Sequence, residues 1–156
     1  METRLPLEVR ELAEHEVAVI EGREPAGKGF VRAMWQLQRD GSSVLLVAWL
    51  GGEPVGSGQL DGRVDPPELK NLNVEVDHRG SGVGTAIVRA AERRLRSGDR
   101  LAVGVGLDNP RARALYERLG YRATDELTTT TYEYVDDQGV RRRATETAET
   151  LIKGIP

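Results

Sequence analysis

The sequence predicts a single domain of mixed α and β structure. Its length of 156 residues suits one domain and is sufficient to bury a core. Apolar runs of strand-like composition alternate along the chain with segments whose apolar residues recur at helical spacing. A glycine-rich loop joins one predicted strand to one predicted helix. No internal repeat or low-complexity linker divides the chain further.

The N-terminal part is predicted to contain a short strand followed by two helices. We expect the strand at Leu5–Leu12 and the helices at Glu14–Glu21 and Phe30–Arg39. The segment Arg23–Gly29, which contains Pro and Gly, is predicted to be the loop between the helices.

A β-hairpin is predicted next. Ser43–Leu50 reads SVLLVAWL, a run with the apolar and β-branched composition of a buried strand. Gly51 and Gly52 follow it, and a glycine pair between strand-like runs favours a tight turn. Pro54–Leu60 is then expected to be the returning strand.

The elements expected after the hairpin are, in order, a strand at Glu68–Val76, a helix at Thr85–Arg96, a strand at Leu101–Leu107 and a short helix at Pro110–Leu119. Asn109 is a typical N-cap residue, and Pro110 suits the first helical position. Gly120 is a typical C-terminal stop.

The C-terminal segment admits two interpretations. Leu127–Val135 is rich in Thr and Tyr and favours a strand, and Asp136–Gly139 is typical of a turn. After the turn, the apolar residues between Val140 and Ile152 fit helical spacing, whereas the Thr content favours a strand. Local pattern leaves both open.

Composition excludes several classes of function. With 22 basic and 25 acidic residues, the net charge of −3 disfavours bulk electrostatic binding to nucleic acid or to an anionic membrane. The chain has no Cys and only two His residues, so thiolate metal sites, other metal centres and a Cys nucleophile are not expected. The longest apolar run, Val44–Leu50, is too short to span a bilayer. The charged N-terminal segment does not resemble a signal peptide, so a cytoplasmic protein is expected.

The most informative stretch is the glycine loop with Gly80, Gly82 and Gly84. A helix N-terminus presents free N–H groups, and glycines let backbone amides approach an anion closely. Arg79 adds a positive charge. The spacing fits neither common nucleotide loop, because Ile87 stands where a dinucleotide-binding loop needs glycine and no Lys follows the glycines. A plain tight turn is the alternative interpretation.

The pattern Arg-x-x-Gly-x-Gly at Arg79–Gly84 resembles the acyl-CoA pyrophosphate loop of the GNAT superfamily of N-acyltransferases. A second pattern, Asn109-x-x-Ala-x-x-Leu-Tyr-Glu-x-x-Gly-Tyr121, is similar to another motif of that superfamily. The resemblance covers roughly Glu68–Arg122. It implies an α+β fold: a mixed, mostly antiparallel twisted sheet of about seven strands, splayed between strands four and five and flanked by about four helices. Residues 1–156 would form one acetyltransferase domain.

The resemblance also implies acetyl-CoA as co-substrate and assigns residues to it. Backbone groups of Val74 and Val76 would pair with the pantetheine arm, and Asn109 would contact the arm or cap its helix. The pyrophosphate would bind to backbone amides of the following residues: Arg79, Gly80, Ser81, Gly82, Val83, Gly84 and Thr85. The resemblance further implies a final strand at Thr145–Lys153, paired with Thr128–Val135.

Two catalytic residues follow from the same resemblance. Tyr116 occupies the position of the family's general acid, which protonates the leaving thiolate, and would also contact the cofactor. The alternative interpretation is an aromatic side chain on the buried face of the short helix. Many relatives place a carboxylate in strand five, but here that position is Gly104. Glu68, in strand four, would instead act as general base through a water, or else is a solvated charge at the start of that strand; Glu75 and His78 are weaker candidates. Without Cys, the acetyl group would pass directly to the amine in a ternary complex.

The acceptor is expected to be an amine of a small molecule or peptide. It would contact the predicted N-terminal helices, the Arg23–Gly29 loop and the last hairpin, where Trp35 either walls the pocket or packs in the core. Acidic residues in this region could attract a cationic amine: Glu14, Glu16, Glu21 and Glu24. The exposed edge of the final strands makes a homodimer possible. The alternative function is an acyl-CoA-binding regulatory module without significant turnover, which the missing strand-five carboxylate favours.

Overall fold

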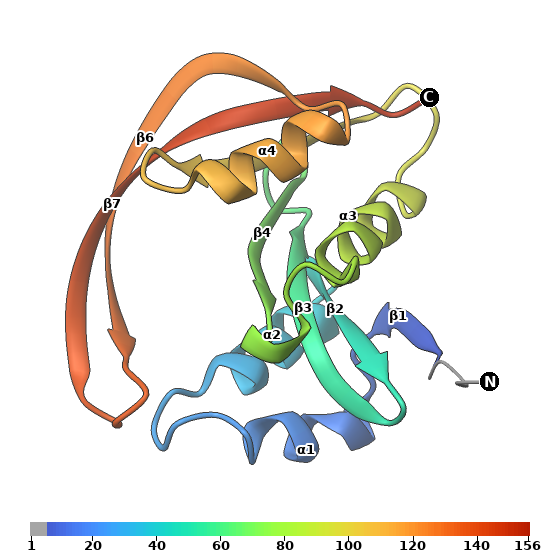
Figure 1. Ribbon diagram of the computed structural model, residues 1–156. Helices are drawn as coiled ribbons and strands as arrows, with labels where there is room; N and C mark the ends of the chain where they lie inside the picture. The colour runs from blue at the N-terminus through green and yellow to red at the C-terminus, as the bar shows by residue number, and fades with distance from the viewer. Residues whose placement is uncertain (1–5) are drawn as a thin grey trace.

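Seven strands form one mixed sheet in the order β1-β2-β3-β4-β5-β7-β6 (Figure 1). The computed structural model describes residues 6–156. Neighbouring strands are antiparallel except β4 and β5. Four α-helices lie against the sheet in the part of the chain that the structure describes. The predicted α+β class and its mostly antiparallel sheet are therefore confirmed.

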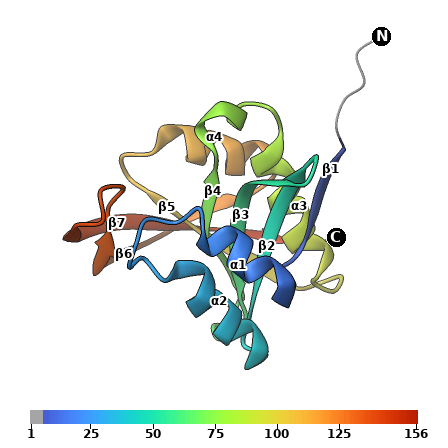
Figure 2. The same cartoon turned by 90° about the horizontal axis from the view of Figure 1, so that it is seen from below.

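The N-terminal elements lie close to the predicted positions. They are β1 (Leu7–Glu11), a 3-10 turn (Glu14–Glu16), α1 (Val17–Glu21), α2 (Phe30–Arg39), β2 (Ser43–Leu50) and β3 (Glu53–Asp61). Leu5, in the predicted first strand, is outside the described residues. The predicted first helix divides into the 3-10 turn and α1. Figure 2 shows α1 and α2 in front of β2 and β3.

β2 is buried on both faces, which explains why its apolar run is continuous rather than alternating. Leu46 and Ala48 belong to the main core, with α3 (Val83–Arg93) and α4 (Pro110–Arg118). Leu45, Val47 and Trp49 face a second core with α1 and α2. Trp35 packs against this second core, as the core interpretation of that residue predicts.

Two glycines of β3 let α3 approach the sheet. A Cβ at Gly56 would lie 2.9 Å from the carbonyl oxygen of Asn73, and one at Gly58 would lie 3.0 Å from the side chain of Ile87 on α3. Both glycines lie within the predicted returning strand Pro54–Leu60, and no local pattern marks them as contact points for a helix. Both are needed because a helix and a neighbouring strand take the space of a side chain.

The second half contains β4 (Glu68–Val74), a 3-10 turn (Val76–His78) and β5 (Arg100–Gly106), besides α3 and α4. The predicted strand Glu68–Val76 is two residues too long, because the chain turns at Val76. The predicted helix Thr85–Arg96 is shifted: α3 begins at Val83, after Gly82 in a left-handed conformation, and ends at Arg93.

The C-terminal segment is a long hairpin of β6 (Arg122–Val135) and β7 (Arg141–Gly154). The strand interpretation is confirmed, but β7 starts four residues before the predicted Thr145. The pairing around the Asp136–Gly139 turn therefore joins Val135 to Arg141. β7 also pairs with β5, and β6 forms the edge of the sheet. In Figure 1 the hairpin curves away from the body toward the segment between α1 and α2.

A buried carboxylate ties β3 to β4. Asp61 is 1% exposed and pairs with Arg63 Nε at 2.9 Å and with Lys70 Nζ at 2.8 Å. Hydrogen bonds from Arg63, together with Lys70, hold the pKa of Asp61 well below its usual range, although burial opposes them. Within residues 6–156, no helix is long and apolar enough to cross a membrane.

We expect Asp61→Asn to lower the free energy of unfolding by about 2 kcal/mol at pH 7, because charge-assisted hydrogen bonds are lost. Since the folded-state pKa of Asp61 is lowered, its contribution is present above the unfolded-state pKa of about 3.9 and is lost as pH falls. Urea unfolding at pH 7, 5 and 3 should show the two proteins converging. Exposed Asp65→Asn is the control, and a pH-independent difference for Asp61→Asn would contradict the assignment.

Candidate functional site

The glycine loop leads from β4 into α3 and leaves several backbone donors free. Gly80 and Gly82 adopt φ of +77° and +90°, which favour glycine. The first helical hydrogen bond of α3 is from Ala86 N–H to Gly82 O, at 3.0 Å. The N–H groups of the preceding first turn, Val83–Thr85, therefore have no partner within the helix. This end of α3 has the donors and the dipole of an anion site.

A cleft of about 710 Å3 lies beside this loop, and we name it the β4–α4 cleft. Its walls are Leu72–Val74 of β4, the glycine loop and one face of α4; its lining includes the predicted residues Val74, Arg79, Gly80, Gly82, Gly84, Thr85 and Asn109. Ser81 and Val83 are in the loop and first turn but do not line it; the Ser81 hydroxyl donates to the His78 carbonyl oxygen. The cleft thus joins most of the residues predicted to bind a cofactor.

Two further arginines line the cleft, Arg111 and Arg118 of α4. With Arg79 they give it three cationic side chains, and none of its lining residues is acidic. The sequence interpretation missed both α4 arginines. Their spacing of seven residues, which places them on one face of a helix, was the available signal. Arginine is well suited to phosphate groups because its guanidinium presents a fork of donors.

The backbone N–H and C=O groups of Val74 point away from β3. Glu75 N–H donates to Val55 O of β3 at 2.8 Å. Because successive residues of a strand turn their backbone groups to opposite sides, those of Val74 point toward the gap between β4 and β5. Arg79 Nε donates to Val74 O at 3.1 Å. Val76 instead begins the 3-10 turn after β4, where its carbonyl accepts from Arg79 N–H. Its pairing with the pantetheine arm stays a prediction.

Asn109 caps α4. Its Oδ1 accepts from Ala112 N–H at 3.1 Å, as the N-cap interpretation predicts. The residue also lines the cleft. Capping occupies the oxygen of the amide, so the side-chain amide nitrogen is the group left for a ligand.

A bulge in β4 marks the point at which the strand leaves β5. β4 and β5 are paired only at Glu68–Ala102 and Leu69–Val103. In the pairing with β3, Lys70 lies opposite Gln59 and Asn73 lies opposite Ser57. Between these pairs β4 has one residue more than β3, which is a β-bulge. Asn71 lies in this bulge with φ of +56°. The predicted splay between the fourth and fifth strands is confirmed.

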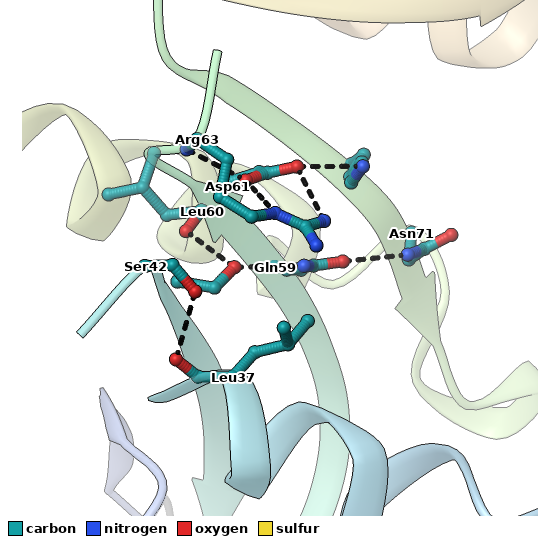
Figure 3. A network of polar contacts seen from close by, with 9 residues as sticks. Leu37, Ser42, Gln59, Leu60, Asp61, Arg63 and Asn71 are labelled. Atoms are coloured by element: carbon teal, nitrogen blue, oxygen red, sulfur yellow. Dashed lines mark hydrogen bonds and ion pairs between the residues drawn. The ribbon is translucent and has the colours of Figure 1, made fainter. Parts of the chain in front are cut away.

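Side-chain hydrogen bonds hold the bulge (Figure 3). Asn71 Nδ2 donates to Gln59 Oε1 at 3.0 Å, and Gln59 Nε2 donates to Ser43 Oγ at 2.8 Å. Gln59 is 1% exposed. A buried amide with both ends satisfied fixes the backbone it contacts. The network therefore connects β2 and β3 to the turn of β4.

A second cavity, of about 640 Å3, lies on the other side of the bulge, and we name it the α1–α2 cavity. It is bounded by the segment between α1 and α2, by β2–β4 and by Asp137 at the tip of the last hairpin. Leu72 and Asn73 line both cavities. The two spaces thus meet at the residues that follow Asn71.

Glu68 stands where β4 and β5 still pair. It is half-buried, and its Oε1 lies 3.5 Å from the position that a Cβ of Gly104 would take. Burial raises the pKa of Glu68; nearby Lys70 lowers it and nearby Asp61 raises it further. Glu68 lines neither cavity, whereas Glu75 lines the α1–α2 cavity. Of the acidic residues predicted near an acceptor, Glu24 lines that cavity, and Glu14, Glu16 and Glu21 do not.

Tyr116 lies in the main core behind the β4–α4 cleft. It is 4% exposed, and its ring meets that of Tyr121 edge-on, with centroids 5.6 Å apart. Neighbouring Leu115 lines the cleft, but Tyr116 does not. Burial raises the pKa of Tyr116 to about 12. The phenol therefore stays protonated at neutral pH and has a proton to donate.

Comparisons with known proteins agree with this fold. The sequence profile of the Acetyltransferase (GNAT) family matches residues 8–121. Among solved structures, the fold is similar to the ribosomal-protein-S18-alanine N-acetyltransferase from Escherichia coli, with 22% identity, a TM-score of 0.65 and coverage of 96% of this chain and 94% of that one. It is also similar to an N-acetyltransferase from Staphylococcus aureus Mu50, with 12% identity, a TM-score of 0.67 and coverage of 97% and 99%. A mutant of the spermidine N-acetyltransferase SpeG from Vibrio cholerae matches with 13% identity, a TM-score of 0.66 and coverage of 95% and 93%.

The loop motif implies coenzyme A as the ligand of this site, and on that basis we expect Gly82→Ala to weaken its binding roughly tenfold, which is about 1.4 kcal/mol. No atom would clash with the new Cβ, but an L-residue resists the φ of +90°, so the amides at the start of α3 would shift. Gly98→Ala is the matched control, because Gly98 has φ of +92°, equally open surroundings and a position outside the cleft. Calorimetric titration should show equal affinity for Gly98→Ala and the wild type; equal losses in both variants would contradict an anion site.

Proposed function

The chain belongs to the Acetyltransferase (GNAT) family, and we propose on this basis that residues 1–156 form one acetyl-CoA-dependent N-acetyltransferase domain. The proposed reaction transfers an acetyl group to a primary amine of a small molecule or peptide by direct attack in a ternary complex. The observation that carries the proposal is that the β4–α4 cleft and the α1–α2 cavity meet at Leu72 and Asn73. Two substrates that approach from opposite sides would meet there.

The β4–α4 cleft fits coenzyme A in shape and in charge. Its three arginines and the free amides of α3 suit phosphate groups. The backbone of Val74 would pair with an amide-containing arm in the manner of an added strand. When bound, acetyl-CoA supplies an acetyl group activated as a thioester. The N–H of a β4 residue near Val74 would donate to the thioester carbonyl oxygen and stabilise the charge that develops on it.

The amine must lose a proton before it can attack. An alkyl ammonium has an ordinary pKa near 10.4, so the neutral amine costs roughly 4–5 kcal/mol at pH 7. Glu68 would accept this proton through a water, and its raised pKa makes it a stronger base than an ordinary carboxylate. Tyr116 would donate from its hydroxyl to the leaving sulfur. The chain has no Cys, so no acetyl-cysteine forms on the protein.

A regulatory module that binds acyl-CoA without significant turnover is the second candidate. Gly104 in place of a strand-five carboxylate favours it, as does the position of Tyr116 behind the cleft. Release of thiol from acetyl-CoA across a panel of amines separates the two functions. Amine-dependent release supports the enzyme, whereas binding of acetyl-CoA without release on any amine supports the module.

Tyr116→Phe is expected to lower kcat by about 10²-fold, the usual scale for loss of a general acid. Because the pKa of Tyr116 is about 12, the residue stays protonated from pH 6 to 10, and the loss should not vary with pH in that range. Steady-state rates with one accepted amine test this. Full activity, or a deficit that changes with pH, would exclude the assigned role.

Glu68→Gln is expected to lower kcat/KM by about 10²-fold at pH 7. The deficit should shrink toward pH 10, where more of the amine is already neutral. In the wild type, the rate should fall as pH drops through the raised pKa of Glu68, and the variant should lack this acidic limb. Glu75→Gln is the comparison: if it removes the limb and Glu68→Gln does not, Glu75 is the base.

A further inference from the structure

The α1–α2 cavity combines an apolar wall with carboxylates. The apolar wall is formed by Ile20, Phe30, Leu45 and Val47. The carboxylates are Glu24 from the segment between the helices, Glu75 from the end of β4 and Asp137 from the hairpin tip. Leu72 and Asn73, which the cavity shares with the β4–α4 cleft, mark the end at which acetyl transfer would occur.

Glu24 is held in place but only half satisfied. Its Oε1 accepts from Val31 N–H, in the first turn of α2, at 2.7 Å. Its Oε2 is buried and has no hydrogen-bond partner. In residues 6–156 the only other buried side-chain atom of this kind is Trp49 Nε1. A carboxylate oxygen removed from water without a donor costs free energy, and a positive charge held nearby in the cavity lowers that cost.

The residues that line the α1–α2 cavity carry more negative than positive charge. Arg23 and Lys28 line it, against three carboxylates. Arg23 Nη2 lies 3.9 Å from a carboxylate oxygen of Glu53, which is outside the cavity. The cavity therefore favours a positively charged occupant, and Glu24 Oε2 is the acceptor that needs one most.

The hairpin tip limits the size of the occupant. Asp137 lines the cavity, and a Cβ at Gly139 would lie 3.9 Å from the carbonyl oxygen of Ala26. The tip thus reaches the segment between α1 and α2, as the curve of the hairpin in Figure 1 indicates. A small molecule fits between these segments better than a folded protein surface.

We propose that the acceptor is a small amine with a second cationic group, an ammonium or guanidinium, which pairs with the carboxylate of Glu24. An apolar linker would lie on the wall of Ile20, Phe30, Leu45 and Val47 and place the reacting amine at Leu72 and Asn73. This assignment rests on the proposed acetyl transfer and specifies its acceptor. Glu24 is then a specificity residue that contacts substrate away from the reacting atoms.

Matched pairs of acceptors test the proposal: α,ω-diaminoalkanes of three to eight carbons against n-alkylamines of the same lengths. We expect a KM roughly tenfold lower for the best diamine than for its monoamine, the ratio that corresponds to 1.4 kcal/mol. Glu24→Gln keeps an oxygen for Val31 N–H but removes the charge. It should raise the KM of diamines to that of monoamines, leave the KM of monoamines unchanged and change kcat less than twofold.

Glu14→Gln is the control, since it removes the same charge from an exposed residue outside the cavity. Equal KM for diamines and monoamines in the wild type would overturn the proposal. Equal effects of Glu24→Gln on both classes would also overturn it, because Glu24 would then act only on the fold of the α1–α2 segment. Thermal unfolding of the variant monitors that fold.

Calorimetric binding of 1,6-diaminohexane and of hexylamine separates this proposal from the proposed function. If no amine releases thiol from acetyl-CoA but the wild type binds the diamine and Glu24→Gln does not, the acetyl-transfer proposal fails and the dication site stands. If amines are acetylated but the diamine binds no better than hexylamine, acetyl transfer stands and the dication site fails.

Discussion

The bulge at Asn71 is the constraint on which the rest of the site depends. A strand in the middle of a sheet normally pairs with both neighbours along its length, yet β4 pairs with β5 at two positions only. The extra residue at Asn71 turns β4 away just after those positions. Beyond it, the backbone of Val74 is left facing a gap, with a cavity on either side of the strand. Without the bulge, β5 would take those backbone groups and the cavities would not meet.

The same bulge keeps the core intact. Leu69, Leu72 and Val74 all pack toward α3, although strict alternation would place Leu69 and Leu72 on opposite faces. The extra residue shifts the alternation of side chains by one position, which returns Leu72 and Val74 to the face that Leu69 occupies. β4 can therefore change its pairing without exposing apolar side chains. The left-handed conformation suits Asn better than most residues, and the Gln59 amide holds the Asn71 side chain from a fully buried position. Core packing and site geometry therefore depend on one hydrogen-bonded network.

Much of this molecule could be predicted from its sequence, and the exceptions have physical reasons. Ser43–Leu50 and Phe30–Arg39 are strongly patterned, and both elements have the predicted bounds. The glycine loop could be predicted from the sequence because Gly82 adopts a positive φ, which favours glycine. The bulge could not be predicted in this way, since an Asn within ELKNLNVEV is compatible with a regular strand. Its position depends on Gln59 and Ser43, which lie on other strands, and no local pattern contains that contact.

In the candidate site, too, some residues could be predicted from local sequence and others could not. Residues of the loop motif, such as Arg79 and Gly82, line the β4–α4 cleft, and their contact with a cofactor stays a prediction. The importance of Glu24 depends on burial of one carboxylate oxygen, which spacing along the chain does not encode. The roles of Glu68 and Tyr116 remain predictions, because both lie outside the cavity linings.

The most direct test of this account is a crystal structure of the protein with coenzyme A. We predict the pantetheine arm between β4 and β5, paired with the backbone of Val74, the pyrophosphate at the first turn of α3 and the sulfur beside Leu72 and Asn73. Coenzyme A bound elsewhere on the protein, with the gap between β4 and β5 empty, would contradict it.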